Sequence, residues 1–203
     1  MIDYFEEQLD MIRHAISSID SELFEQLVDH ATCALNNGHR VIVTGLGKNV
    51  PICEKFAGTM ISMGLDALFM NTNSAFHGDM GCIRDGDVLI VLSKSGETLE
   101  AIELVRELND QGRHVDQWLI TYSHESTLRD LVPQRLVMDL EHEGDLWDVM
   151  PNNSTIVNLF VLQGIAILVA QRMGVELGQF ARNHPGGAIG ALLSEKKGLY
   201  GLK

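Results

Sequence analysis

Short, uninterrupted apolar runs recur along the chain and alternate with longer segments of helical periodicity. Each run is about one β-strand long and lacks the polar alternation of a strand that faces water on one side. Strands buried on both faces are typical of a parallel sheet whose crossover connections are helices. We therefore expect an α/β fold, a three-layer sandwich with a central parallel sheet flanked by helices. The expected strands are residues 41–45, 67–70, 87–93, 117–123 and 135–140.

The remaining segments predict helices around this sheet. Apolar side chains recur every four residues within residues 2–36, which indicates N-terminal helices. Residues 154–173 are apolar nearly all round, which predicts a buried helix. No internal repeat or linker interrupts the chain. We expect a single domain over residues 1–203, with N-terminal helices over 2–36 and an α/β core over 37–194.

Charge and cysteine content narrow the partners. The chain carries 28 acidic and 15 basic residues, a formal net charge of −13. Binding to nucleic acid or to an anionic membrane needs a concentrated basic surface, so we expect neither partner. The N-terminus is acidic, and the three cysteines show no C-x-x-C spacing. This pattern is typical of reduced thiols in a cytoplasmic protein.

The segment TGLGKNV forms a glycine-rich turn between the first strand and a helix. A dinucleotide fingerprint needs a third glycine where Val50 stands. A nucleotide P-loop needs glycine in place of Ile42 and serine or threonine in place of Asn49. What remains is a tight turn, with Gly47 before Lys48, at a helix N-terminus. A lysine there opposes the helix dipole, which hints at a functional role.

The segment SKSGETLE follows the most apolar strand and is suited to binding an anion. Ser93, Ser95 and Thr98 offer hydroxyl donors. Gly96 lets the backbone approach a ligand closely, and the following helix presents free N–H groups. A phosphate fits this description. Glu97 has two readings, because its carboxylate either points into solvent or acts as a base near the sugar end of the ligand.

Three loops rich in reactive side chains, residues 45–49, 71–82 and 93–98, each follow a predicted strand. Ligands of parallel sheets bind beyond the carboxyl ends of the strands. The middle loop carries His77, two residues before Asp79. This spacing could supply metal ligands, but no third ligand is specified, so an incidental loop histidine is the competing interpretation.

Two later segments complete a pattern. EGDLWDVMPNNST places Glu143 before a long helix, and NHPGGAIG places His184 before paired glycines. Together with GLGK, HGDMG and SKSGETLE, they resemble the SIS (sugar isomerase) domain family, which has a flavodoxin-like fold. The resemblance covers roughly residues 35–194 and is narrowest to the arabinose 5-phosphate isomerases.

The resemblance implies roles by position. Lys48 corresponds to the family's active-site lysine and Glu97 to its catalytic glutamate. Glu143 and His184 correspond to further proposed acid/base groups, and His77 to a second active-site histidine. The substrate- and phosphate-binding positions are Gly47, Ser93, Ser95, Gly96 and Thr98.

The chain departs from the family at three places. Lys94 stands where these isomerases usually have asparagine, which adds a positive charge beside the anion loop. MPNNST replaces a more usual threonine- and serine-rich segment, which leaves the exact sugar open. Familiar members continue into a tandem CBS pair, whereas this chain ends at Lys203, so we expect an unregulated, stand-alone isomerase domain.

The resemblance implies an aldose–ketose isomerase that interconverts D-arabinose 5-phosphate and D-ribulose 5-phosphate through an enediolate. This chemistry needs no cofactor, and His77 is only a weak metal candidate. We expect a homotetramer in which His184 reaches a neighbouring subunit's pocket. One alternative is another sugar-phosphate isomerase of the same fold, against which the HPGG segment argues. The other is a non-catalytic phosphosugar-binding SIS regulator, which would not need Lys48, Glu97, Glu143 and His184 together.

Overall fold

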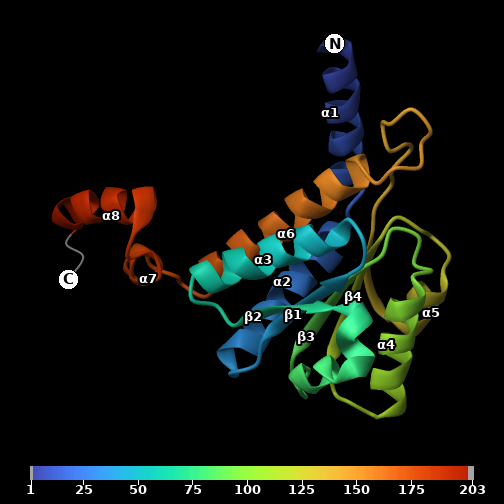
Figure 1. Ribbon diagram of the computed structural model, residues 1–203, viewed down its shortest axis with the longest axis horizontal. Coiled ribbons are helices and arrows are strands. Elements are labelled where there is room, and N and C mark those ends of the chain that lie inside the picture. Colours follow the sequence, from blue (N-terminus) through green and yellow to red (C-terminus); the bar gives the residue numbers. More distant parts are fainter. Residues whose placement is uncertain (1, 201–203) are drawn as a thin grey trace.

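Five parallel strands form the central sheet of the computed structural model, which describes the backbone of residues 2–200 and the side chains of residues 2–194 (Figure 1). The strand order is β2-β1-β3-β4-β5, and every neighbouring pair is parallel. The predicted strands and the α/β fold class are confirmed. The strands are β1 (Val41–Gly45), β2 (Ala67–Asn71), β3 (Val88–Leu92), β4 (Asp116–Thr121) and β5 (Gln134–Val137).

Helices cover both faces of the sheet, which explains why its strands are apolar throughout. Alternate residues of β3 enter different layers: Ile90 packs in one core and Leu89 in the other. The first core lies under α2 (Ser21–Asn36), α3 (Asn49–Ser62) and α6 (Asn153–Arg172). The second lies under α4 (Leu99–Asp110), α5 (Thr127–Leu131) and the short 3-10 helices η1 (Thr72–His77) and η2 (Asp79–Cys82).

The N-terminal segment forms two helices, as expected. The first, α1 (Ile2–Ser17), packs against α6 and projects beyond the sheet (Figure 1). The second, α2, begins after Asp20, whose carboxylate accepts the N–H groups of Glu22 and Leu23. This N-cap separates the two helices, because it satisfies the first free donors of a new helix.

The helix α6 is a core helix with one open face. Ten of its residues are buried, as its apolar sequence predicted. Phe160 and Ile167 nevertheless remain exposed on its outer side. Among the described helices, α6 alone is long and apolar enough to cross a membrane, but 56% of its most apolar window is buried inside the fold. Its packing against α1, α2 and α3 accounts for its hydropathy.

The last two helices lie beyond the far end of α6 (Figure 1). The first, α7 (Leu177–Arg182), packs near the end of α3, where Asn183 donates to the carbonyl of Ser62 at 3.2 Å. The second, α8 (Gly187–Tyr200), extends away from the sheet. The sheet and its covering helices are thus complete at α6. Residues 1 and 201–203 of the expected domain lie outside the described range, and the domain boundaries stay a prediction.

Candidate active site

A crevice at the carboxyl edge of the sheet follows from the strand order. From β1 the chain turns through α3 to β2, whereas from β3 it turns through α4 to β4 on the other face. Gly45 and Leu92 are paired in the sheet, so the two loops start side by side and leave in opposite directions. Such a switch point is where ligands bind in open α/β sheets. The fold therefore brings the Lys48 turn next to the serine loop, residues 93–98.

The turn after β1 presents Lys48 to solvent. Gly47 adopts a positive φ of 61°, which lets the chain reverse directly into α3. Lys48 is the N-cap residue of α3 and makes no side-chain capping hydrogen bond. Its ammonium group is exposed at the mouth of the crevice, as the sequence predicted for its position.

Within the serine loop the hydroxyl groups divide between shaping the loop and facing outward. Ser93 is buried, and its Oγ lies 2.8 Å from Oγ1 of Thr98 while accepting the N–H of Gly96 at 3.1 Å. Ser95 is exposed, and its Oγ accepts the N–H of Glu97 at 3.1 Å. Ser95 and the start of α4 are therefore the groups placed to meet a phosphate, and Ser93 and Thr98 hold the loop in shape.

Glu97 is exposed but its carboxylate has a defined partner. Its Oε1 accepts the N–H of Thr127, the first residue of α5, at 2.7 Å. Hydrogen bonds from the backbone and then the side chain of Thr127 hold the pKa of Glu97 below its ordinary value. The side chain is thus ionised at neutral pH, as a proton acceptor must be.

Glu143 is fully buried and accepts hydrogen bonds on both oxygens. Its Oε2 accepts the N–H groups of Asn152 and Ser154, each at 2.9 Å. Its Oε1 lies 2.7 Å from Oγ of Ser154 and 2.6 Å from Nζ of Lys94. Burial alone would raise the pKa of Glu143, but Lys94 and these hydrogen bonds together hold it below its ordinary value. The sequence analysis did not anticipate this ion pair.

A buried chain of hydrogen bonds links the start of α6 to the Lys48 turn. Tyr122 Oη, at the end of β4, donates to the carbonyl of Ser154 at 3.0 Å and to Oδ1 of Asn158 at 2.9 Å. Asn158 Nδ2 donates to Oδ1 of Asn49, beside Lys48, at 3.0 Å. Sequence reasoning missed this network. The polar residues Asn153, Ser154 and Asn158 inside an apolar helix were the available signal.

His184 lies away from the crevice of its own chain. Its ring stacks on Phe180 with centroids 4.0 Å apart, and Nδ1 lies 2.8 Å from the Phe180 carbonyl. The neighbouring Asn183 binds Ser62 at the C-terminal end of α3, whereas Lys48 caps the opposite end. A helix of 14 residues is about 21 Å long, so one chain does not bring His184 to Lys48.

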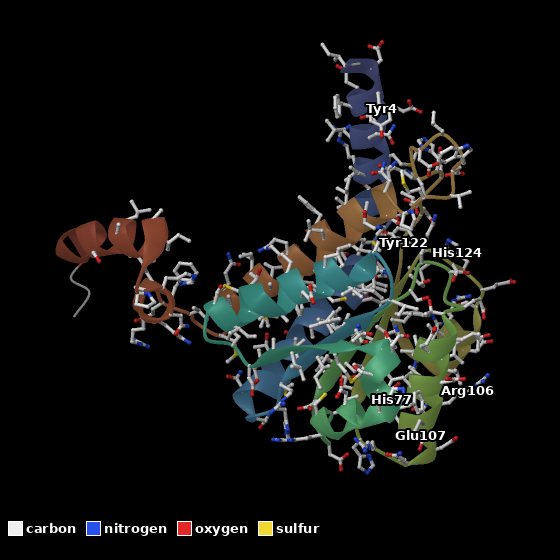
Figure 2. The ribbon with its side chains drawn as sticks, in the orientation of Figure 1. Tyr4, His77, Arg106, Glu107, Tyr122 and His124 are labelled. Carbon is white, nitrogen blue, oxygen red and sulfur yellow. The ribbon has the colours of Figure 1, made fainter. Side chains whose placement is uncertain are left out.

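His77 is exposed at the end of η1. It lies on the side of Arg106 and Glu107 of α4, apart from Tyr122 (Figure 2). Among the described residues no three histidine, cysteine or carboxylate side chains gather as a metal site. The geometry therefore gives the metal interpretation of His77 no support.

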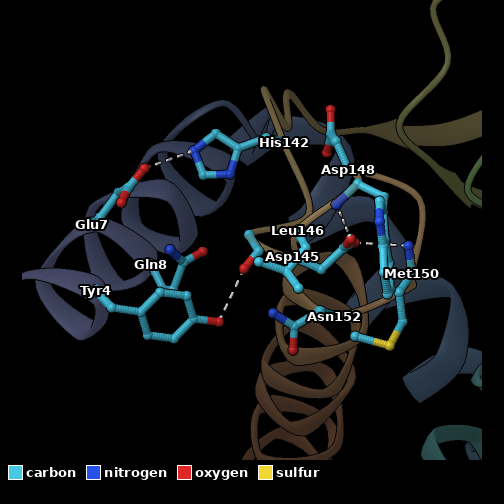
Figure 3. Close-up of a pocket in the computed structure, with 11 residues that line it drawn as sticks. Tyr4, Glu7, Gln8, His142, Asp145, Leu146, Asp148, Met150 and Asn152 are labelled. Atoms are coloured by element: carbon cyan, nitrogen blue, oxygen red, sulfur yellow. Dashed lines mark hydrogen bonds and ion pairs between the residues drawn. The ribbon is translucent and has the colours of Figure 1, made fainter. Parts of the chain in front are cut away.

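A hollow of about 600 Å³ lies between α1 and the loop that carries Glu143 (Figure 3). Tyr4 Oη donates to the carbonyl of Gly144 at 3.0 Å, and His142 lies 3.6 Å from Glu7. The carboxylates of Glu7, Asp145 and Asp148 line it, so it is poorly suited to a phosphate. We assign it a structural role, in which α1 supports the loop.

The comparison with known families agrees with the geometry of the crevice. The SIS domain model matches residues 34–168, so this chain belongs to the SIS domain family. The predicted family is confirmed.

Particular relatives carry the arabinose 5-phosphate isomerase name. The chain is 32% identical to KdsD of Pseudomonas aeruginosa PAO1 over 89% of this chain and 55% of that protein. It is 32% identical to GutQ of Escherichia coli K12 over 89% of this chain and 56% of that protein. The chain thus spans about half the length of these curated relatives. The c3406 protein of E. coli CFT073, solved in complex with arabinose 5-phosphate, has a TM-score of 0.79 and 27% identity, covering 90% of this chain and 94% of that one.

Proposed function

We propose that the protein is an aldose–ketose isomerase of a pentose 5-phosphate, which interconverts D-arabinose 5-phosphate and D-ribulose 5-phosphate. One observation carries the proposal: the switch-point crevice combines an anion loop, the free cation of Lys48 and the ionised carboxylate of Glu97. The names of KdsD and GutQ, and the sugar-phosphate complex of the E. coli neighbour, support a pentose phosphate as the substrate.

The residues divide the chemistry among them. The phosphate binds at Ser95 and the N-terminus of α4, where N–H groups and the helix dipole favour an anion. Glu97 takes the proton from C2 of the aldose and returns it to C1 of the enediolate. The Lys48 ammonium stabilises the negative charge that develops on the enediolate oxygens. Electrons and protons balance within the substrate, so the scheme needs no cofactor.

The site is shared between subunits of a homotetramer in this proposal. His184 lies at the far end of α3 from Lys48, so the His184 that assists ring opening comes from the partner subunit. Ile2, Phe5 and Leu9 of α1 and Phe160 of α6 are exposed apolar side chains that another subunit would cover. The cytoplasmic location and the lack of a nucleic-acid partner remain predictions from charge and cysteine content.

A regulator that binds phosphosugars without turning them over is the second candidate. One observation favours it: both carboxylates are engaged within the chain, Glu97 with Thr127 and Glu143 with Lys94. An enzyme must release or use one of these carboxylates during each turnover. Exchange of a carbon-bound proton therefore separates the two candidates.

The test is a coupled assay over a panel of pentose and hexose phosphates in deuterated water. We expect turnover of D-arabinose 5-phosphate, with deuterium appearing at C2 of the substrate. Glu97→Gln should lower kcat by about 10²–10⁴, the usual contribution of a general base, and lower deuterium incorporation in parallel. Glu103→Gln, on the exposed face of α4, is the matched control and should change neither. Binding without proton exchange would favour the regulator, and turnover of hexose phosphates alone would favour a different isomerase.

A further inference from the structure

Lys94 links the serine loop to the buried carboxylate of Glu143. It lies between Ser93 and Ser95, and its Nζ is 2.6 Å from Glu143 Oε1. Its own carbonyl accepts the hydroxyl of Thr121 and the N–H of Tyr122, each at 3.1 Å. The backbone at Lys94 is therefore tied to the end of β4, and the side chain spans from a fixed point to Glu143.

The donors to Glu143 are not equivalent. The N–H groups of Asn152 and Ser154 and the Ser154 hydroxyl belong to the first turn of α6. Lys94 comes from a different loop, its side chain is 44% exposed, and it can leave without unwinding a helix. It is also the cation that the described structure places against this carboxylate.

The other charged and titratable groups around Glu143 do not replace Lys94. Asp148 carries a negative charge and accepts the N–H of Glu143 at 2.6 Å. Tyr122 is neutral, because burial and then the charge of Glu143 raise the pKa of its phenol. His142 is directed to Glu7 on α1. Removing the lysine would therefore leave a buried carboxylate without a compensating cation, which favours protonation.

We propose that Lys94 is a positioning residue that holds Glu143 as an ionised carboxylate at the edge of the crevice. The serine loop thereby sets both the phosphate position, through Ser95, and the charge of a carboxylate, through Lys94. Only the link to turnover rests on the proposed function. In the ligand-free state Glu143 is not a proton donor, because both of its oxygens accept hydrogen bonds.

The pH dependence of kcat/KM for D-arabinose 5-phosphate tests the link to turnover. Lys94→Met removes the charge but keeps the length, so Glu143 should protonate at higher pH. We expect the acidic limb of the profile to move up by about 1–3 pH units, the usual effect of a neighbouring charge. Lys94→Arg should restore the wild-type limb, and Lys55→Met, on the exposed side of α3, should leave it unchanged. An unmoved limb in Lys94→Met would overturn the role in turnover.

Urea unfolding tests the pair without any activity. Because the pKa of Glu143 is lowered by folding, its ionisation contributes stability above the ordinary glutamate pKa, and this contribution is lost as the pH falls through the folded-state value. Lys94→Met should therefore lower the unfolding midpoint most at neutral pH and less in acid. In a Glu143→Gln background the same change should have little effect, because the partner is already neutral.

The two experiments fail separately. If no sugar phosphate is turned over, the proposed function is wrong and the unfolding cycle alone decides the ion pair. If Glu143→Gln does not fold, the narrowing gap between wild type and Lys94→Met at low pH gives the same coupling. Equal effects of Lys94→Met in both backgrounds, together with a pH-independent gap, would overturn the ion pair itself.

Discussion

Single hydroxyl groups within the serine loop have different tasks. Ser93 is buried and bonded to Thr98 and to the N–H of Gly96, so its hydroxyl is engaged before any ligand arrives. Ser95 is exposed beside the start of α4 and accepts only a local N–H from Glu97 among its described contacts. Loss of Ser93 should thus disturb the loop, whereas loss of Ser95 should disturb the ligand.

Ser95→Ala should raise KM for the sugar phosphate. A hydrogen bond to a charged group contributes about 1.5–3 kcal/mol, which corresponds to a change of roughly 10- to 150-fold. Steady-state kinetics measure this change, and the unfolding midpoint should stay close to wild type. Ser17→Ala, on exposed α1, is the matched control. An unchanged KM would show that the phosphate is held elsewhere.

At the scale of elements, the serine loop and α5 hold each other. Gly96 has a positive φ of 68°, and its carbonyl accepts the N–H of Leu128 at 3.1 Å. A Cβ on Gly96 would lie 2.0 Å from Oγ of Ser126, the N-cap of α5. The same helix start binds Glu97 through Thr127. The close approach at Gly96 therefore fixes both the loop and the direction of the Glu97 carboxylate.

Gly96→Ala should destabilise the protein for two reasons. The left-handed backbone costs about 1–2 kcal/mol for a residue with a Cβ, and displacing Ser126 adds about 1–3 kcal/mol of overpacking. Gly38→Ala has a similar φ of 77° with nothing within 4 Å of the new Cβ, so it measures the backbone cost alone. Urea unfolding of both variants gives the difference. Equal losses would mean that α5 moves away without cost.

At the scale of the whole molecule, the proposed site needs two chains. His184 and Lys48 are associated with opposite ends of α3, and α8 extends away from the sheet (Figure 1). A subunit that carries His184→Ala still offers an intact crevice to a neighbour. A subunit that carries Glu97→Gln still offers an intact histidine.

Mixing the two inactive variants should therefore restore activity. When subunits exchange freely, some sites combine an intact Glu97 crevice with an intact His184, and activity should rise to a substantial fraction of wild type. Exchange is verified separately by mass spectrometry of differently labelled chains. Activity that stays absent despite exchange, or a fully active monomer by light scattering, would contradict the shared site.

The fold could be predicted from the sequence because burial leaves a local record. A strand covered on both faces is apolar at every position, so the run from Val41 to Gly45 marks a strand without knowledge of its neighbours. The positions of Lys48 and Ser95 at the crevice follow from the same pattern, because the loops after parallel strands meet at one edge. Family motifs added the expected chemistry of these loops.

What only the tertiary structure decided are the pairings between distant segments. Lys94 meets Glu143, and Tyr122 meets Asn158, because the strand order sets the end of β3 and β4 beside the start of α6. Glu97 binds α5, and His184 lies far from the crevice, for the same reason. Local periodicity reports whether a side chain is buried but not which charge it meets, so these contacts depend on how the layers pack.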